Sequence, residues 1–132
     1  MKRCWRASTA AAVLSSTAWA AQAPPPDFAA FRAKFVAAVK AKDLKAVAAL
    51  TAFPLANATY GEPDSLSESA FMKRSRDLYA VFAGCLATQP ATLDPPPKNG
   101  ERSWAIDCDG QVFHFAQRGG AWRYVKQENI NE

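Results

Sequence analysis

The sequence is poor in the residues that build metal centres and covalent catalytic sites. Its 132 residues include one histidine and three cysteines, with no C-x-x-C pair. Because zinc sites are built from several cysteines and histidines at short spacings, the sequence predicts no metal site and no cofactor. It also lacks G-x-S-x-G, H-E-x-x-H and a phosphate-cradling glycine loop. These absences exclude the serine hydrolases, zinc proteases and nucleotide-binding proteins that depend on those motifs.

The N-terminal apolar run is too short to cross a membrane. Residues 7–18 are small or apolar, follow three basic side chains and precede the A-x-A site Ala18-Trp19-Ala20. That order is typical of a secretory signal peptide, whereas a membrane-spanning helix needs about 20 apolar residues. We expect residues 1–20 to be a signal peptide, so that the mature protein is periplasmic or secreted and has no membrane insertion.

Removal of the signal peptide leaves little excess charge. The whole chain carries a net charge of +4, and residues 1–20 hold three of its 16 basic side chains and none of its 12 acidic ones. The mature chain therefore has 13 basic and 12 acidic side chains, a net charge of +1. Because nucleic-acid binding depends on clustered positive charge, this composition predicts no nucleic-acid partner.

Two cysteines remain after cleavage, Cys85 and Cys108. An even pair in an exported chain is typical of a disulfide. The alternatives are two free buried thiols or half of a metal site, and a single histidine argues against the metal site. We expect the disulfide, with Cys85 at the end of a helix and Cys108 near the end of a strand.

Residues 103–126 predict three antiparallel strands. Asp109-Gly110 and Gly119-Gly120 suit two-residue hairpin turns, which need positive φ angles. These turns set the register of the strands, and alternation then sorts the side chains onto two faces. One face carries Trp104, Ile106, Cys108, Phe113, Phe115, Trp122 and Tyr124. The other face carries Ala105, Asp107, Val112, His114, Ala116, Arg123 and Val125.

The earlier chain predicts helices that cover the aromatic face. Residues 21–26 form a proline-rich tether, and residues 27–132 form a single α+β domain. Apolar side chains at helical spacing predict helices over about 28–41, over a shorter stretch after Asp43, and from Ser65 or Ser67 to near Gly84.

The fold class that follows is α+β. Two to three N-terminal helices pack on one face of a curved antiparallel C-terminal meander of three to four strands. Residues 53–60 form a short strand or a bend, and part of 86–93 is a candidate for an extra strand of the meander. Most of the stretch from 89 to 102 is predicted to be a long irregular loop, and such loops are often functional.

Three sets of residues are candidate sites. Aromatic side chains between helices and sheet either line a pocket or pack as core: Tyr79, Trp104, Phe115 and Tyr124. His114 is predicted to lie opposite Val125, with Asp107 and Arg123 as diagonal neighbours. That cluster is either an acid–base pair with an anion-binding arginine or an ordinary polar outer face. The third set is an exposed binding loop: Pro95, Pro96, Pro97 and Lys98.

The order of elements resembles the nuclear-transport-factor-like superfamily of cone-shaped α+β domains. The likeness rests on two N-terminal helices, the Phe53-Pro54-Leu55 bend, a third helix and a curved meander whose last hairpin carries Gly120-Ala121-Trp122-Arg123-Tyr124. It covers residues 28–128 and is strongest to small exported members of unknown function. The resemblance implies either an isomerase, dehydratase or cyclase or a non-enzymatic binding domain. Ketosteroid-isomerase-like members use an aspartate base, a tyrosine and a protonated acid, and no residue here is matched to that set.

Three functions follow from these patterns. The first is an exported small binding domain without evident catalytic machinery, whose partner is a small molecule or a protein. The second is a cone-fold enzyme, isomerase-like or dehydratase-like, that acts on a small hydrophobic substrate. The third is an inhibitor or immunity-type protein that acts through the 89–102 loop. A homodimer is an alternative to the monomer in each case.

Overall fold

The computed structural model describes residues 23–74, 77–95 and 100–131. The helices are α1 (Pro26–Lys40), α2 (Leu44–Ala49), α3 (Glu68–Met72), α4 (Asp77–Ala80) and α5 (Ala83–Thr88). The strands are β1 (Thr51–Ala58), β2 (Ser65–Leu66), β3 (Thr92–Leu93), β4 (Ser103–Cys108), β5 (Gln111–Arg118) and β6 (Ala121–Asn129). None of the helices within these ranges is long and apolar enough to span a membrane.

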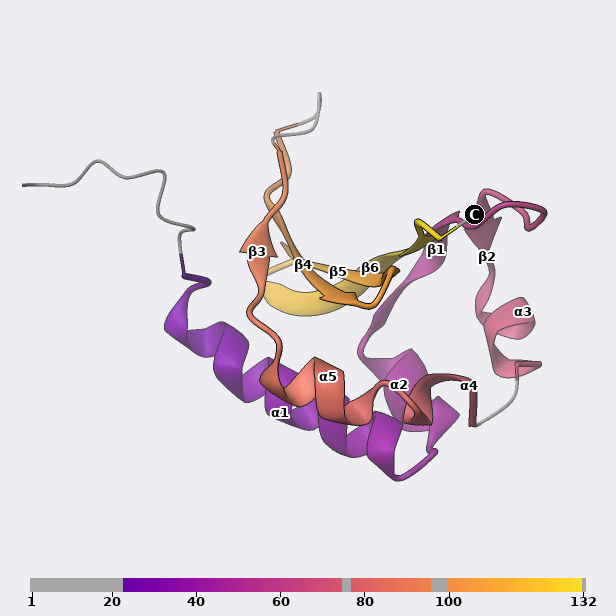
Figure 1. The fold of residues 1–132 in the computed structure, drawn as a ribbon, viewed down its shortest axis with the longest axis horizontal. Coiled ribbons are helices and arrows are strands. Elements are labelled where there is room, and N and C mark those ends of the chain that lie inside the picture. The colour runs from indigo at the N-terminus through magenta and orange to yellow at the C-terminus, as the bar shows by residue number, and fades with distance from the viewer. Residues whose placement is uncertain (1–22, 75–76, 96–99, 132) are drawn as a thin grey trace, which may run out of the picture.

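The strands form one curved sheet in the order β2-β1-β6-β5-β4-β3. Helices α1, α2, α4 and α5 gather on one side of this sheet (Figure 1). The prediction of an α+β fold with helices on one sheet face is therefore confirmed. The predicted strand count is wrong, because the described residues form a mixed sheet of six strands, with β1 parallel to β6.

Strand β1 is the element that the sequence leaves undecided. In place of the short strand or bend expected over residues 53–60, the structure has an eight-residue strand. It pairs in parallel with β6, so that Thr51 lies opposite Tyr124 and Ala56 opposite Lys126. A parallel pair joins segments that are far apart in the chain and needs no tight turn. No local turn signal therefore marks this partnership in the sequence.

The predicted third helix is divided into three short helices. Ser67 caps α3 as expected, since its hydroxyl accepts a hydrogen bond from the Ala70 amide at 3.1 Å. Gly84 was predicted to follow the end of a helix. In the structure it lies inside α5. The predicted helix would have buried one continuous apolar stripe. Each of the three short helices instead buries one large side chain in the core. These side chains are Phe71, Tyr79 and Leu86.

The predicted hairpin register is confirmed over most of its length. Trp104 lies opposite Phe115, and Phe115 lies opposite Tyr124. Asp109 and Gly110 both have positive φ angles, 57° and 92°, as a primed two-residue turn requires. One pairing is wrong: His114 lies opposite Lys126 and not Val125. The reason is a β-bulge, which leaves Val125 as an extra residue in β6.

The bulge exchanges the faces of the residues that follow it. Because side chains alternate along a strand, one inserted residue moves every later side chain to the other face. Lys126 and Glu128 therefore join the face of His114, and Gln127 turns toward the helices, where it is 2% exposed. Both polar clusters described below depend on this exchange.

The face toward the helices is the aromatic core. Ring centroids of Phe35 in α1 lie 5.1 Å from Phe115 and 5.3 Å from Tyr124, both with near-perpendicular rings. Such edge-to-face pairs add to the gain from burying the rings. The predicted apolar set is buried throughout: Trp104, Ile106, Cys108, Phe113, Phe115, Trp122 and Tyr124.

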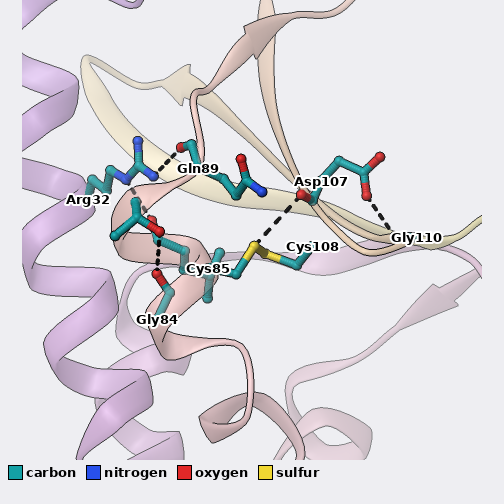
Figure 2. Close-up of a disulfide and its surroundings, with 9 residues drawn as sticks. Arg32, Gly84, Cys85, Gln89, Asp107, Cys108 and Gly110 are labelled. Carbon is teal, nitrogen blue, oxygen red and sulfur yellow. Dashed lines mark hydrogen bonds between the residues drawn. A yellow bond between two sulfur atoms is a disulfide. The ribbon is translucent and has the colours of Figure 1, made fainter.

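A disulfide joins α5 to the end of β4. The predicted bond between Cys85 and Cys108 is present, with Cα atoms 5.8 Å apart. Figure 2 shows Arg32 of α1 on the other side of the same helix, where its guanidinium donates to the Leu86 carbonyl at 2.6 Å and to the Gln89 carbonyl. The helix is thus held to the sheet by the covalent bond and to α1 by the arginine.

Candidate functional site

The aromatic side chains named as candidate pocket residues lie in the packed core. The rings of Phe115 and Tyr124 are 5.6 Å apart and both residues are at most 1% exposed. Trp104 is buried beside them, and its edge borders a hollow of about 640 Å³ that also touches Trp122. Tyr79 is buried too, and it lines a smaller hollow of about 230 Å³.

The strand register keeps Asp107 and Arg123 diagonal to His114 on the predicted sheet face, but no hydrogen bond or ion pair joins any two of these three described residues. Asp107 is exposed, and its carboxylate accepts a hydrogen bond from the Gly110 amide at 2.8 Å within the hairpin turn. The Arg123 guanidinium donates to the neighbouring Trp122 carbonyl. His114 is buried and makes its contacts elsewhere on the sheet.

His114 lines a hollow of about 410 Å³, which we call the His114 hollow. It lies on the sheet face that is turned away from the aromatic core, because His114 alternates with the core residues Phe113 and Phe115. Strands β1, β4, β5 and β6 and the residues after β3 supply its walls. The lining residues are Ala56, Asp94, Pro95, Glu101, Ser103, His114, Arg118, Val125, Lys126 and Glu128.

Both ring nitrogens of His114 face carboxylates. Nδ1 lies 2.7 Å from Asp94 Oδ2, which also accepts a hydrogen bond from the Ser103 hydroxyl at 2.6 Å. Nε2 lies 3.4 Å from Glu128 Oε1. Nε2 is buried and has no hydrogen-bond partner among the residues that the structure describes. Buried polar atoms are nearly always paired, so this nitrogen needs an explanation.

Asp94 is an ionised acceptor in this arrangement. Burial alone would raise the pKa of its carboxyl. Hydrogen bonds from His114 and Ser103, together with electrostatic attraction to His114 and Lys126, outweigh burial and hold the pKa below its ordinary value. Its backbone amide donates to the Ser103 carbonyl at 2.9 Å, which fixes the residue beside β4.

Charge pairs surround the opening. Arg118 makes two hydrogen bonds to the Glu101 carboxylate, at 3.0 and 3.1 Å, and this interaction raises the pKa of the guanidinium. The Lys126 ammonium lies 3.9 Å from Glu128 Oε2. Lys126 and Glu128 reach the hollow only because of the bulge at Val125.

A second polar cluster lies inside the fold, on the face toward the helices. The Tyr79 hydroxyl donates to Gln127 Oε1 at 3.0 Å, and the Gln127 amide donates to Asn57 Oδ1 at 3.0 Å. Asn57 in turn donates to Glu62, which also pairs with Arg74 at 2.8 Å. The hollow above this cluster is about 230 Å³. That volume is smaller than the roughly 300–1,000 Å³ of ordinary ligand pockets.

The pKa values of the ionisable groups in this inner cluster are shifted away from neutral pH. A hydrogen bond from Asn57 is the main cause that lowers the pKa of Glu62. Burial raises the pKa of Tyr79 to about 12. The cluster is a hydrogen-bonded network that runs from the buried Gln127 to the exposed Glu62.

The predicted binding loop lies mostly outside the described residues. Pro96, Pro97 and Lys98 fall in the range that the structure does not describe. Pro95 is described, is exposed and forms part of the wall of the His114 hollow.

Comparisons with known proteins give a likeness of fold. No family model matches the chain, and no curated protein matches it. Among solved structures, the chain is similar to an NTF2-like protein of unknown function from Pseudomonas putida KT2440. The two are 14% identical, the match covers 77% of this chain and 82% of the other, and the TM-score is 0.40. A likeness of this size assigns no function to this chain.

The two residues that complete the site, Asp94 and Glu128, were not among the candidates from the sequence. Asp94 follows a two-residue strand in the stretch where an extra strand was expected, and pairing of Thr92 with Ala105 carries Asp94 toward Ser103 and His114. Glu128 could not be assigned to this face from the sequence, because the bulge that places it there has no sequence signature. In the described part of the chain, no group of three or more His, Cys, Asp or Glu side chains is arranged to hold a metal ion.

Proposed function

We propose that this protein is a small binding domain and that the His114 hollow is its ligand site. The observation that carries the proposal is His114 Nε2, a buried ring nitrogen without a hydrogen-bond partner that lines a hollow of about 410 Å³ beside Glu128. The volume lies within the usual range for small-molecule pockets. Seven of the ten lining residues have polar or charged side chains, so a polar ligand suits the hollow.

The interior of the fold offers less support for an enzyme with a small hydrophobic substrate. The aromatic face is filled by packed rings, and the inner hollow is bordered by groups that are already paired. A general acid or base must exchange a proton near the working pH. The shifted pKa values of Glu62 and Tyr79 oppose that role. Binding in the outer hollow is thus favoured over acid–base catalysis in the interior.

The cone-fold enzyme is the second candidate, and one observation favours it. The 2.7 Å contact between His114 Nδ1 and Asp94 is the geometry of an oriented imidazole base. Nε2 would then take the proton from substrate, with Glu128 Oε1 3.4 Å away. Isotope exchange or isomerisation assays on the wild-type protein and on His114→Gln test this candidate, which requires an activity that the variant loses.

The proposal also places the protein in the periplasm or outside the cell. The Cys85–Cys108 bond supports this location, since disulfides persist in oxidising compartments. The signal-peptide pattern of residues 1–20 supports it from the sequence and lies outside the described residues. Intact-mass measurement of the exported protein tests cleavage after Ala20, and a mature species that still contains Trp19 would overturn it.

The test of binding is a nuclear magnetic resonance screen of the protein purified from the periplasm. Amide signals of Ser103, His114 and Val125 are followed while small polar molecules are added. We expect a subset of these molecules to shift the three signals in a saturable way. Glu128→Gln should weaken the effect.

Asp107→Asn is the matched control for that variant. Asp107 is also a carboxylate on this sheet, but it is exposed in a hairpin turn and is not part of the lining. The proposal fails if no compound shifts the signals around the hollow, or if saturable shifts appear only around Tyr79 and Gln127.

A further inference from the structure

The His114 ring lies between carboxylates that come from two different parts of the sheet. The ring belongs to β5, and its side chain is 10% exposed. Asp94, which follows the edge strand β3, lies 2.7 Å from Nδ1, and Glu128 of β6 lies 3.4 Å from Nε2. In the order of strands, β4 and β5 separate β3 from β6. The ring therefore links the edge of the sheet to β6 across two other strands.

These two contacts fit a ring that carries both of its protons. An ionised carboxylate can only accept hydrogen bonds, so a histidine satisfies a carboxylate on each side only when both nitrogens are protonated. The positive ring then attracts both acidic groups. Although burial opposes it, the contact with His114 helps to hold the pKa of Asp94 below its ordinary value. The geometry is thus that of an imidazolium between two acceptors.

The two contacts of the ring differ in length and in support. The 2.7 Å contact with Asp94 is at the short end of the usual range of about 2.7–3.2 Å. Asp94 is also fixed by the Ser103 hydroxyl at 2.6 Å and by its own amide, which donates to the Ser103 carbonyl. The 3.4 Å contact with Glu128 is longer than that range, and the Glu128 side chain is 29% exposed. When the ring loses one proton, it therefore loses the one on Nε2.

The other charged residues in the described lining favour the release of Glu128. They are Glu101, Arg118 and Lys126. Glu101 and Arg118 bond to each other at the opening. Lys126 lies opposite the histidine in the ladder, and its ammonium is 3.9 Å from Glu128 Oε2, so it is placed to hold this carboxylate once the ring is neutral. Lys98 is outside the described residues.

We infer that His114 is a pH-sensitive latch between the edge of the sheet and β6. The doubly protonated ring holds Asp94 and Glu128 together. Loss of the Nε2 proton leaves two acceptors face to face, so Glu128 turns to Lys126 while Asp94 stays bound to Nδ1. Histidine is the side chain whose charge ordinarily changes between about pH 5 and 8. The latch goes beyond the proposed function, because it changes one wall of the His114 hollow whether or not a ligand is present.

The test is a pH titration of the isotope-labelled, full-length exported protein by nuclear magnetic resonance. The ring nitrogens of His114 and the carboxyl carbons of Asp94 and Glu128 are followed together. At mildly acidic pH, both ring nitrogens should be protonated. As the pH rises, Nε2 should lose its proton while Nδ1 keeps its own, and the Glu128 carboxyl signal should move in the same step.

Charge variants shift this step in opposite directions. Glu128→Gln removes the anion that stabilises the positive ring, so Nε2 should lose its proton about one pH unit lower than in the wild type. Lys126→Gln removes a like charge and the alternative partner of Glu128, so the step should move to higher pH. Asp107→Asn is the matched control and should leave the step unchanged, because that carboxylate is bonded to the Gly110 amide in the hairpin turn.

Three results would overturn the latch. They are loss of the Nδ1 proton before the Nε2 proton, a Glu128 signal that stays constant through the step, and equal titration of the wild type and Glu128→Gln. None of these measurements needs a ligand, so they leave the binding proposal to the compound screen. A titration as expected in a protein whose hollow binds no compound would support the latch and overturn the proposed function alone.

Discussion

Replacing Gln127 with alanine tests whether the bulge at Val125 sets the two faces of β6. Gln127 is 2% exposed, accepts a hydrogen bond from the Tyr79 hydroxyl and donates one to Asn57. The Tyr124 hydroxyl also donates to Gln127, so removal of the side chain leaves three buried groups with a hydrogen bond unmade, and each such group costs about 1–3 kcal/mol. We therefore expect a loss of about 2–5 kcal/mol in the free energy of unfolding.

Urea unfolding followed by fluorescence measures that loss as a lower midpoint at an unchanged slope. Lys126→Ala is the matched control, since Lys126 is half exposed and its ion pair spans 3.9 Å. Surface pairs of this kind contribute about 0–1 kcal/mol. Without the bulge the two residues would exchange faces. A large loss for Lys126→Ala together with a small one for Gln127→Ala would refute the register described here.

Three further predictions use the same unfolding measurement. Cys108→Ala, which removes the bond between α5 and β4, should lower stability by about 2–5 kcal/mol, and an equal midpoint for oxidised and reduced wild-type protein would contradict it. Phe115→Ala, at the centre of the aromatic core, should cost about 3–5 kcal/mol, and a loss below that of an exposed site would mean that the core is packed differently. Because the pKa of Asp94 is lower in the folded protein than its ordinary value of 3.8, its stabilising effect is present above that pH and is lost as the pH falls through the lowered value. Asp94→Asn should therefore flatten the stability profile below about pH 3.8, and a profile with the wild-type slope there would count against the contact with His114.

Local signals in the sequence determined the hairpins and the aromatic face, and the number of cysteines left after signal cleavage predicted the disulfide. A two-residue turn such as Asp109-Gly110 admits few geometries, so the residues on either side of it must pair in one register. Alternation then places Phe113 and Phe115 together and separates them from His114. These relations depend on residues that are neighbours in the chain, and for that reason they can be derived before the fold is known.

Long-range packing decided the rest of the fold. The pairing of β1 with β6 joins residues about 70 positions apart, such as Asn57 and Gln127. No tight turn connects the two strands, so the sequence contains no local signal for this pairing. The division of the third helix likewise depends on where Phe71 and Tyr79 meet the core. Intrinsic helix propensity is weak enough for such packing to override it.

The candidate site was decided by the tertiary structure. The sequence identified His114 as the histidine on the outer sheet face but assigned it Asp107 and Arg123 as neighbours. One extra residue at Val125 shifted the register of β6, and β3 carried Asp94 to the other side of the ring. A bulge depends on how β5 and β6 fit the curved sheet as a whole. The alternation of apolar and polar residues along either strand therefore does not predict it.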